Sequence, residues 1–211
     1  APRAYFYKGV VYQSMYEINY NNSADFNTLQ TAYNAYKKAL KYDVSKEITS
    51  MIIKKVGVTA NLFLKQGVQE FNNKDYKTAL KAFENTLEIN SRPEIMYLDT
   101  IVIYNAALAA RYAGNFDKAE KYYKDLIIFN FEGSKMYYEL ANLYKQNGFS
   151  DDYMKRMEKG LKAYPEDNDL LVEIVNYHLS NNENEKANQY LDKAIKKEPN
   201  NPTYNFVQAS F

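Results

Sequence analysis

Few residues in this sequence have the types and spacing that catalysis or metal binding requires. His178 is the only histidine among 211 residues, and the chain contains no cysteine. A zinc site or a catalytic histidine needs further ligands or hydrogen-bonding partners of these types. We therefore expect His178 to pack in or near the core, and we predict no catalytic residue, no metal site and no cofactor.

Acidic residues gather at two positions, at Asp151–Asp152 and at Glu166, Asp167 and Asp169. Two carboxyl groups that flank one glycosidic bond can hydrolyse it. Here, however, both groups stand where stretches of helical periodicity begin. Acids in such places accept hydrogen bonds from free amides and interact favourably with the helix dipole. We interpret them as residues that begin helices, so the sequence does not favour a glycosidase.

The overall charge gives no strong attraction to nucleic acids. The 27 basic and 26 acidic residues leave a net charge of +1, and the lysine pairs are interspersed with acids along the chain. The sequence also has no run of about 18 apolar residues that could span a membrane. We predict no nucleic-acid partner and no membrane span.

A spacing of 34 residues organises much of the sequence. Pro165 and Pro199 are separated by this distance, and each follows a lysine-rich stretch. The same spacing separates four small residues in apolar stretches, Ala107, Ala141, Val175 and Ala209. Polar turns such as "AGNF" at 113–116 come next, and each leads into a second stretch with apolar residues three and four apart. The sequence thus predicts repeated pairs of helices.

The stretch "LFLKQGVQEFNNKDYKTALKAFENTLEIN" at 62–90 has the clearest pattern. It places a small residue in a first helix, an Asn-rich turn, and an alanine and an aromatic residue at helical spacing in a second helix. This pattern resembles the tetratricopeptide repeat, a helix–turn–helix unit of about 34 residues. The resemblance implies an all-α fold, a right-handed α-solenoid of antiparallel helix pairs, in one domain over residues 1–211. The units are expected at about 4–42 (degenerate, with an insertion at 14–26), 59–92, 100–133, 134–167 and 168–201.

Two segments fall outside the 34-residue spacing, residues 44–58 and 93–99. We predict that each lengthens the first helix of the unit that follows it. Gly57 would be a position for a kink in one of these helices, and Pro93 would lie in the first turn of the other. Asp99 would then belong to an exposed polar pair within a helix.

Residues 202–211 begin like a further first helix. Pro202 suits an initial turn, and Tyr204, Val207 and Phe211 have helical spacing. We expect a short helix here, as the start of another unit or as a cap. Because the end of such an array is open, it provides a surface for self-association. The helix is expected to pack against Ala187, Leu191 and Ala194.

In the family that the chain resembles, the first helices of the units line a concave groove. The resemblance implies a non-catalytic scaffold that binds an unknown protein or peptide in this groove. A glycan- or small-ligand-binding helical-repeat protein of a bacterial envelope system is the alternative. Glu139 stands where family members that clamp chaperone tails have an arginine, so a chaperone co-receptor is not expected. The groove residues expected by resemblance are Leu64, Val68, Phe71, Tyr104, Leu108, Arg111, Lys135, Tyr138, Asn142, Lys145, Val172 and Asn176.

The whole-chain layout is similar to that of bacterial multi-repeat proteins that are often exported. This similarity makes the periplasm the expected compartment, with the cytoplasm as the alternative. The absence of cysteine fits both compartments, because proteins of either kind can lack disulfides.

Overall fold

The structure is a computed structural model, and it describes residues 2–23 and 25–208. These residues form helices and no strand, so the prediction of an all-α fold built from helix pairs is confirmed. The helices are α1 (Pro2–Ser23), α2 (Phe26–Tyr42), α3 (Thr49–Asn72), α4 (Tyr76–Asn90), α5 (Thr100–Tyr112), α6 (Phe116–Ile128), α7 (Lys135–Gln146), α8 (Ser150–Ala163), α9 (Asn168–Ser180), α10 (Asn184–Lys197) and α11 (Pro202–Gln208).

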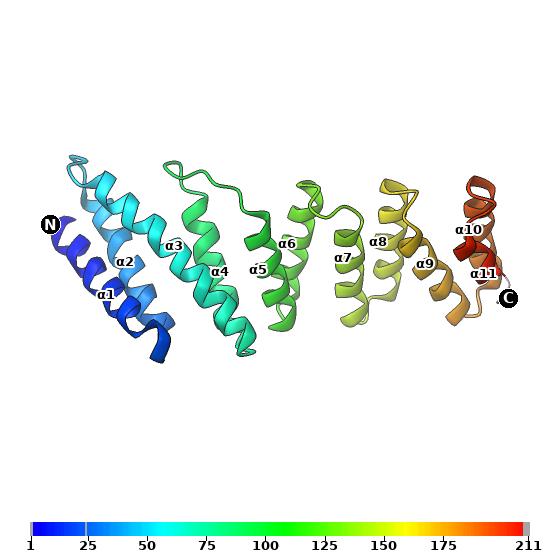
Figure 1. The fold of residues 1–211 in the computed structure, drawn as a ribbon, viewed down its shortest axis with the longest axis horizontal. Coiled ribbons are helices and arrows are strands. Elements are labelled where there is room, and N and C mark those ends of the chain that lie inside the picture. Colours follow the sequence, from blue (N-terminus) through cyan, green and yellow to red (C-terminus); the bar gives the residue numbers. More distant parts are fainter. Residues whose placement is uncertain (1, 24, 209–211) are drawn as a thin grey trace. The chain divides into compact units, whose positions relative to one another are not determined.

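The chain divides into two compact units, Ala1–Tyr122 and Tyr123–Phe211. In the first unit, α1 packs against α2, α3 against α4, and α4 against α5, while α2 also contacts α3 (Figure 1). Helices that follow one another in the sequence are therefore neighbours in space, as expected for a repeat array. One cluster of this unit's core includes Phe6, Leu29, Tyr33, Tyr36, Ile52, Val56, Phe63 and Ile89.

Polar side chains are built into the core between α1, α2 and α3. Tyr36 donates a hydrogen bond of 2.7 Å to Gln13, and Tyr16 donates one to Gln66. All four side chains are buried, so each hydrogen bond compensates for polar groups removed from water. Gly9 allows the close approach of α2, because a Cβ atom at this position would lie only 2.4 Å from the Tyr36 ring. Residues 14–23 continue α1 as a helix.

The first segment outside the 34-residue spacing lengthens a helix, as predicted. After a short connection, α3 begins at Thr49 and continues through Gly57 to Asn72 without interruption. The Asp43 carboxylate holds the connection, because it accepts hydrogen bonds from the Ile48 amide at 3.1 Å and the Thr49 hydroxyl at 2.7 Å.

The prediction that residues 93–99 lengthen the next helix is wrong. Helix α5 begins only at Thr100, where the Asp99 carboxylate accepts a hydrogen bond of 3.1 Å from the Val102 amide. Met96 has a φ of 44°, which lies in the left-handed region and breaks a right-handed helix. The Tyr97 amide donates to the carbonyl oxygen of Asn90 instead, so the segment is a loop.

In the second unit, α7 packs against α8, α9 against α10, and α10 against α11, while α8 also contacts α9. Ala141 and Val175, which share the 34-residue spacing, are both buried in the cores of this unit. Gly160 brings α8 close to its neighbours, because a Cβ atom there would lie 2.8 Å from Cβ of Tyr137. The small residues of the repeat thus allow helices to pack closely.

The single histidine is buried in the second unit, as the sequence predicts. His178 is 5% exposed, and its ring stacks on Tyr190 with the centroids 5.6 Å apart. At the end of the described chain, Tyr204 of α11 lies in one cluster with Ala187, Leu191 and Ala194. Residues 209–211 of the predicted terminal segment, which include Ala209 and Phe211, lie outside the described residues. No described helix combines the length and the hydropathy needed to cross a membrane.

Candidate interaction surface

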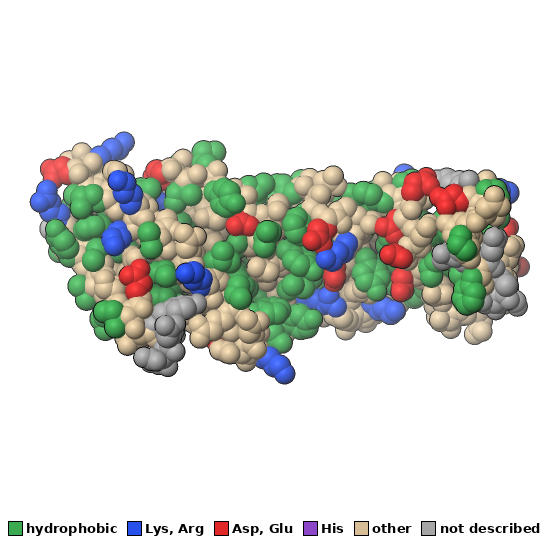
Figure 2. Space-filling model, in the orientation of Figure 1, with side chains coloured by type: hydrophobic (Ala, Val, Ile, Leu, Met, Phe, Trp, Pro, Cys, Tyr) green, Lys and Arg blue, Asp and Glu red, His purple; other side chains and the backbone are tan. Residues whose placement is uncertain are grey.

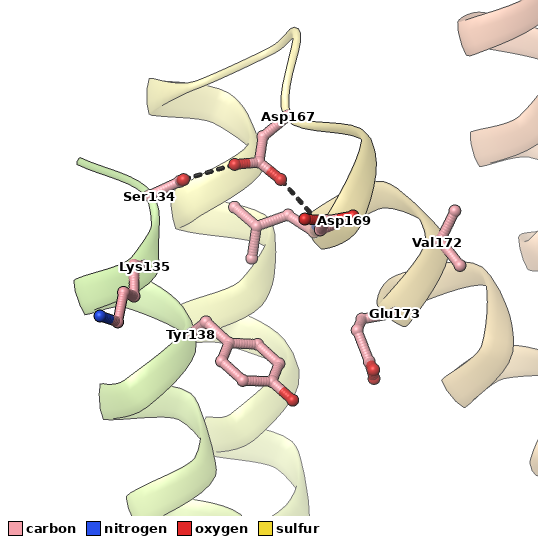
Figure 3. Close-up of a pocket in the computed structure, with 8 residues that line it drawn as sticks. Ser134, Lys135, Tyr138, Asp167, Asp169, Val172 and Glu173 are labelled. Atoms are coloured by element: carbon pink, nitrogen blue, oxygen red, sulfur yellow. Dashed lines mark hydrogen bonds between the residues drawn. The ribbon is translucent and has the colours of Figure 1, made fainter. Parts of the chain in front are cut away.

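A cleft of about 550 Å³ lies between α7 and α9 in the second unit (Figure 3). Helix α7 contributes one wall, and the start of α9 contributes the other. The cleft is open to solvent and combines apolar, aromatic and acidic groups. Its lining residues are Ser134, Lys135, Tyr138, Asp167, Asp169, Leu170, Val172 and Glu173.

Asp167 fixes the upper edge of the cleft. One carboxylate oxygen accepts a hydrogen bond of 2.8 Å from the Leu170 amide and so caps α9. The other oxygen accepts a hydrogen bond from the hydroxyl of Ser134, which directly precedes α7. Because one side chain joins the starts of two successive first helices, the two walls are held in a defined position.

Tyr138 and Glu173 form the middle of the cleft. Figure 3 shows the Tyr138 ring projecting from α7 towards α9, with the Glu173 carboxylate on the opposite wall. Behind them, Tyr153 is buried in the core cluster against which Tyr138 also packs. Burial raises the pKa of Tyr153 to about 12, with smaller contributions from Glu173 and Tyr138. Tyr153 therefore stays neutral at physiological pH and supports the floor of the site.

The cleft carries an excess of negative charge. Within the described chain, neither Asp169 nor Glu173 forms an ion pair, and Asp167 is occupied by its two hydrogen bonds. Lys135 points away from Tyr138 in Figure 3 and pairs with Glu132. The field inside the cleft thus favours a cation.

Three of the predicted groove residues in this unit line the cleft, namely Lys135, Tyr138 and Val172. The other three do not. Asn142 is half-buried, Asn176 is exposed, and the ammonium group of Lys145 lies 4.9 Å from the centre of the Tyr153 ring. None of these six side chains is fully buried, so each can be reached by a partner.

The predicted groove residues of the first unit lie on α3 and α5, and none of them is fully buried. Phe71 belongs to an aromatic cluster in which its ring centre lies 5.1 Å from Tyr76 and 5.8 Å from Tyr112. Arg111 places its guanidinium group 6.0 Å from the centre of the Tyr112 ring. Part of this set is therefore engaged in packing at the helix ends. The six residues are Leu64, Val68, Phe71, Tyr104, Leu108 and Arg111.

Sequence reasoning missed several residues that line the cleft. The sequence predicts only that Asp167 and Asp169 begin a helix, and Asp167 does cap α9. The spacing of four residues between Asp169 and Glu173 predicts that both carboxylates lie on one helix face, and this pattern identifies them as a candidate acidic surface. Ser134 could not be predicted from the sequence, because its hydrogen-bond partner Asp167 lies 33 residues away in the next repeat.

The described residues show no cluster of three or more histidine and acidic side chains that could hold a metal ion. The polar groups of the cleft can instead accept hydrogen bonds and attract positive charge.

Comparisons with known proteins bear on the fold. No family model matches the sequence, and no curated protein matches it. Among solved structures, the C-terminal part of a TPR repeat-containing protein from Cytophaga hutchinsonii aligns with a TM-score of 0.51 and 16% identity, over 97% of this chain and 86% of that one. MamA from Desulfovibrio magneticus RS-1 aligns with a TM-score of 0.46 and 12% identity, over 92% of this chain and 97% of that one. PilW, described as a widely conserved type IV pilus biogenesis factor, aligns with a TM-score of 0.49 and 13% identity, over 95% of this chain and 98% of that one.

Proposed function

We propose that this chain, which has the tetratricopeptide-repeat fold, is a non-catalytic scaffold that binds a segment of another protein. The cleft between α7 and α9 is the proposed site, and the preferred segment carries a lysine or an arginine. The observation that carries the proposal is the position of the Tyr138 ring opposite the Glu173 carboxylate.

An aromatic ring and carboxylates in one cleft suit a basic side chain. The face of a tyrosine attracts a cation placed within about 6 Å of its centre. Glu173 and Asp169 can accept charge-assisted hydrogen bonds from the same group. An apolar wall at Leu170 and Val172 would contact the aliphatic stem of lysine or arginine, which such residues bury along apolar surfaces.

The walls of the site are helices, and the contact between Ser134 and Asp167 holds their starts together. A receptor that is already ordered loses little entropy when it binds, so more of the interaction energy appears as affinity. An extended segment suits this site better than a folded domain, because the cleft has a volume of only about 550 Å³.

In the first unit, the six predicted groove residues remain candidates for further contacts. Val68 is the most accessible of them, at 44% exposure, because the other five are partly buried. Val68, Tyr104 and Leu108 are only partly buried or exposed, so they offer apolar contacts to a partner within the first unit alone.

Selection of short random peptides on the intact chain tests the proposal. We expect enrichment of peptides with lysine or arginine and a loss of affinity at high salt, because exposed charge pairs are screened. Replacement of Glu173 by glutamine should weaken binding of the tightest peptide by about 1 kcal/mol or more, because a charge-assisted hydrogen bond is lost.

Glu185→Gln is the matched control, since Glu185 is an exposed acid in the first turn of α10 and does not line the cleft. Tyr138→Leu tests the aromatic contribution and keeps an apolar side chain against the core. Enrichment of peptides that lack a basic residue would contradict the proposed site. An equal loss of affinity in Glu173→Gln and Glu185→Gln would contradict it as well.

A further inference from the structure

Helix α1 has apolar residues on two opposite faces. One face is directed into the first unit, where Phe6 packs against Tyr36 and Tyr16 donates a hydrogen bond to Gln66. On the other face, Tyr7, Val11, Met15 and Ile18 remain 61%, 55%, 47% and 79% exposed. Together with the exposed Ala4, these four residues are named the outer stripe of α1.

The outer stripe is continuous along the helix. Its residues follow one another at intervals of three or four, so they lie on a single face. Ala4, Val11 and Ile18 also recur every seven residues, as in the seam of a coiled coil. Hydrophobic side chains are visible over α1 on the face drawn in Figure 2.

Exposure of such a stripe is unfavourable for an isolated helix at the surface. Helices that are apolar on all sides are normally buried, and contiguous exposed apolar patches mark interaction sites. Within the described chain, α1 makes its main contacts with α2 and α3, which lie against its other face. The outer stripe therefore needs a partner from outside the unit.

We propose that the outer stripe of α1 binds the outer stripe of a second copy of this chain. The two helices would run antiparallel around a two-fold axis at Val11, so that residue i faces residue 22 − i. Ala4 would then face Ile18 of the second copy, and Tyr7 would face Met15. The smallest residue of the stripe, Ala4, would thus contact the large Ile18, and the Val11 side chains of the two copies would contact each other at the axis.

This match of sizes favours a second copy over an unrelated helix. A two-fold interface uses one patch twice, so the patch must be complementary to itself. The charges agree with this arrangement, because Lys8 would face Ser14 and Glu17 would face Tyr5. Like charges do not face each other along the seam in this register.

The contact is short, so the dimer should be weak. Fourteen residues separate Ala4 from Ile18, which corresponds to about 21 Å of helix. One helix pair of this length buries less than the about 1,200 Å² typical of stable interfaces. We expect a reversible dimer that forms as the concentration rises.

Sedimentation equilibrium of the whole chain, from about 1 μM to about 500 μM, measures this association over the range expected for weak complexes. Val11→Glu would place two carboxylates face to face on the axis and should raise the dissociation constant about 100-fold or more. Val44→Glu is the control, since Val44 is 88% exposed and lies outside the outer stripe. This control should dimerise like the original chain.

Disulfide formation gives a second test, because the chain contains no cysteine. After mild oxidation, Val11→Cys should form a covalent dimer, since a two-fold axis at this residue brings the two sulfur atoms into bonding range. A mixture of Ala4→Cys and Ile18→Cys chains should yield mixed dimers, whereas Val44→Cys should cross-link only slowly.

The result expected is concentration-dependent dimerisation that Val11→Glu abolishes and Val11→Cys traps. The proposal is overturned if the chain stays monomeric at every concentration and Val11→Cys cross-links no faster than Val44→Cys. It is also overturned if a dimer forms but persists in Val11→Glu. Val11 lies outside the core, so at a concentration where the chain is monomeric, circular dichroism should show an unchanged melting curve for Val11→Glu and for reduced Val11→Cys.

Discussion

Gly67 of α3 lies directly against the ring of Phe83 of α4, and a Cβ atom on Gly67 would come within 2.6 Å of that ring. Both residues are buried, so the contact sets how closely the two helices of this pair approach. The same helix contains Gly57, where a Cβ atom would meet no heavy atom within 4 Å. Two glycines of one helix thus have different roles.

The first prediction compares alanine at these two positions. Gly67→Ala should destabilise the protein by about 1–3 kcal/mol, because the added methyl group overpacks a filled core. Gly57→Ala should stabilise it by about 0.5–1 kcal/mol, because alanine has the higher helix propensity. Urea unfolding followed by circular dichroism measures both changes, and equal effects of the two substitutions would show that α3 and α4 are not packed as described.

The second prediction concerns acid. The pKa of Glu183 lies below its ordinary value, first because Lys186 donates a hydrogen bond to it and also because His178 does. A depressed pKa in the folded state contributes stability above the ordinary value of 4.5, and this contribution is lost as the pH falls below that value. Glu183→Gln should therefore make the stability less dependent on pH in this acidic range.

Urea unfolding at neutral pH and at several values below 4.5 measures this dependence. Glu185→Gln serves as the control, because Glu185 lies two residues further along the chain, in the first turn of α10, and is exposed. A steeper acid dependence in Glu183→Gln than in the control would contradict the role given to the hydrogen bonds of Glu183.

The third prediction concerns alkali. Burial raises the pKa of Tyr153 to about 12, above its ordinary value of 10.0. Between these values the unfolded chain loses the Tyr153 proton more readily than the folded chain, so stability falls as the pH rises. Tyr153→Phe should flatten this decrease by about 1.4 kcal/mol per pH unit at most. Urea unfolding of the original chain and of Tyr153→Phe between pH 9 and pH 12 measures the decrease. Equal loss of stability in both proteins would contradict the prediction.

Much of the helix arrangement could be predicted because the repeat is a local pattern. Small residues such as Ala141 and Val175 recur at a fixed spacing, and their burial follows from the close packing of each helix pair. The loop before α5 could not be predicted in this way. Its apolar residues continue a helical pattern in sequence, but the chain turns at Met96 and the Asp99 cap starts a new helix.

The cleft was only partly predictable for a related reason. Helical phase identifies Tyr138 and Val172 as surface residues of two first helices, because phase depends on neighbours in sequence. The contact between Ser134 and Asp167 depends on how two units stack, which the pattern of one helix does not contain. Glu173 could have been included from its spacing to Asp169, since both lie on one face of α9.

The last prediction concerns α11, a helix of seven residues that contacts α10. Tyr204 is 4% exposed, and its hydroxyl donates a hydrogen bond to Asn168, whereas Phe206 is 75% exposed. Tyr204→Ala should lower the stability by about 2–3 kcal/mol, the value of burying one large side chain. Phe206→Ala should change it by less than about 0.5 kcal/mol, because surface substitutions have small effects. Thermal unfolding of the two variants distinguishes a packed terminal helix from a loose one, since a loose helix would leave both melting temperatures unchanged.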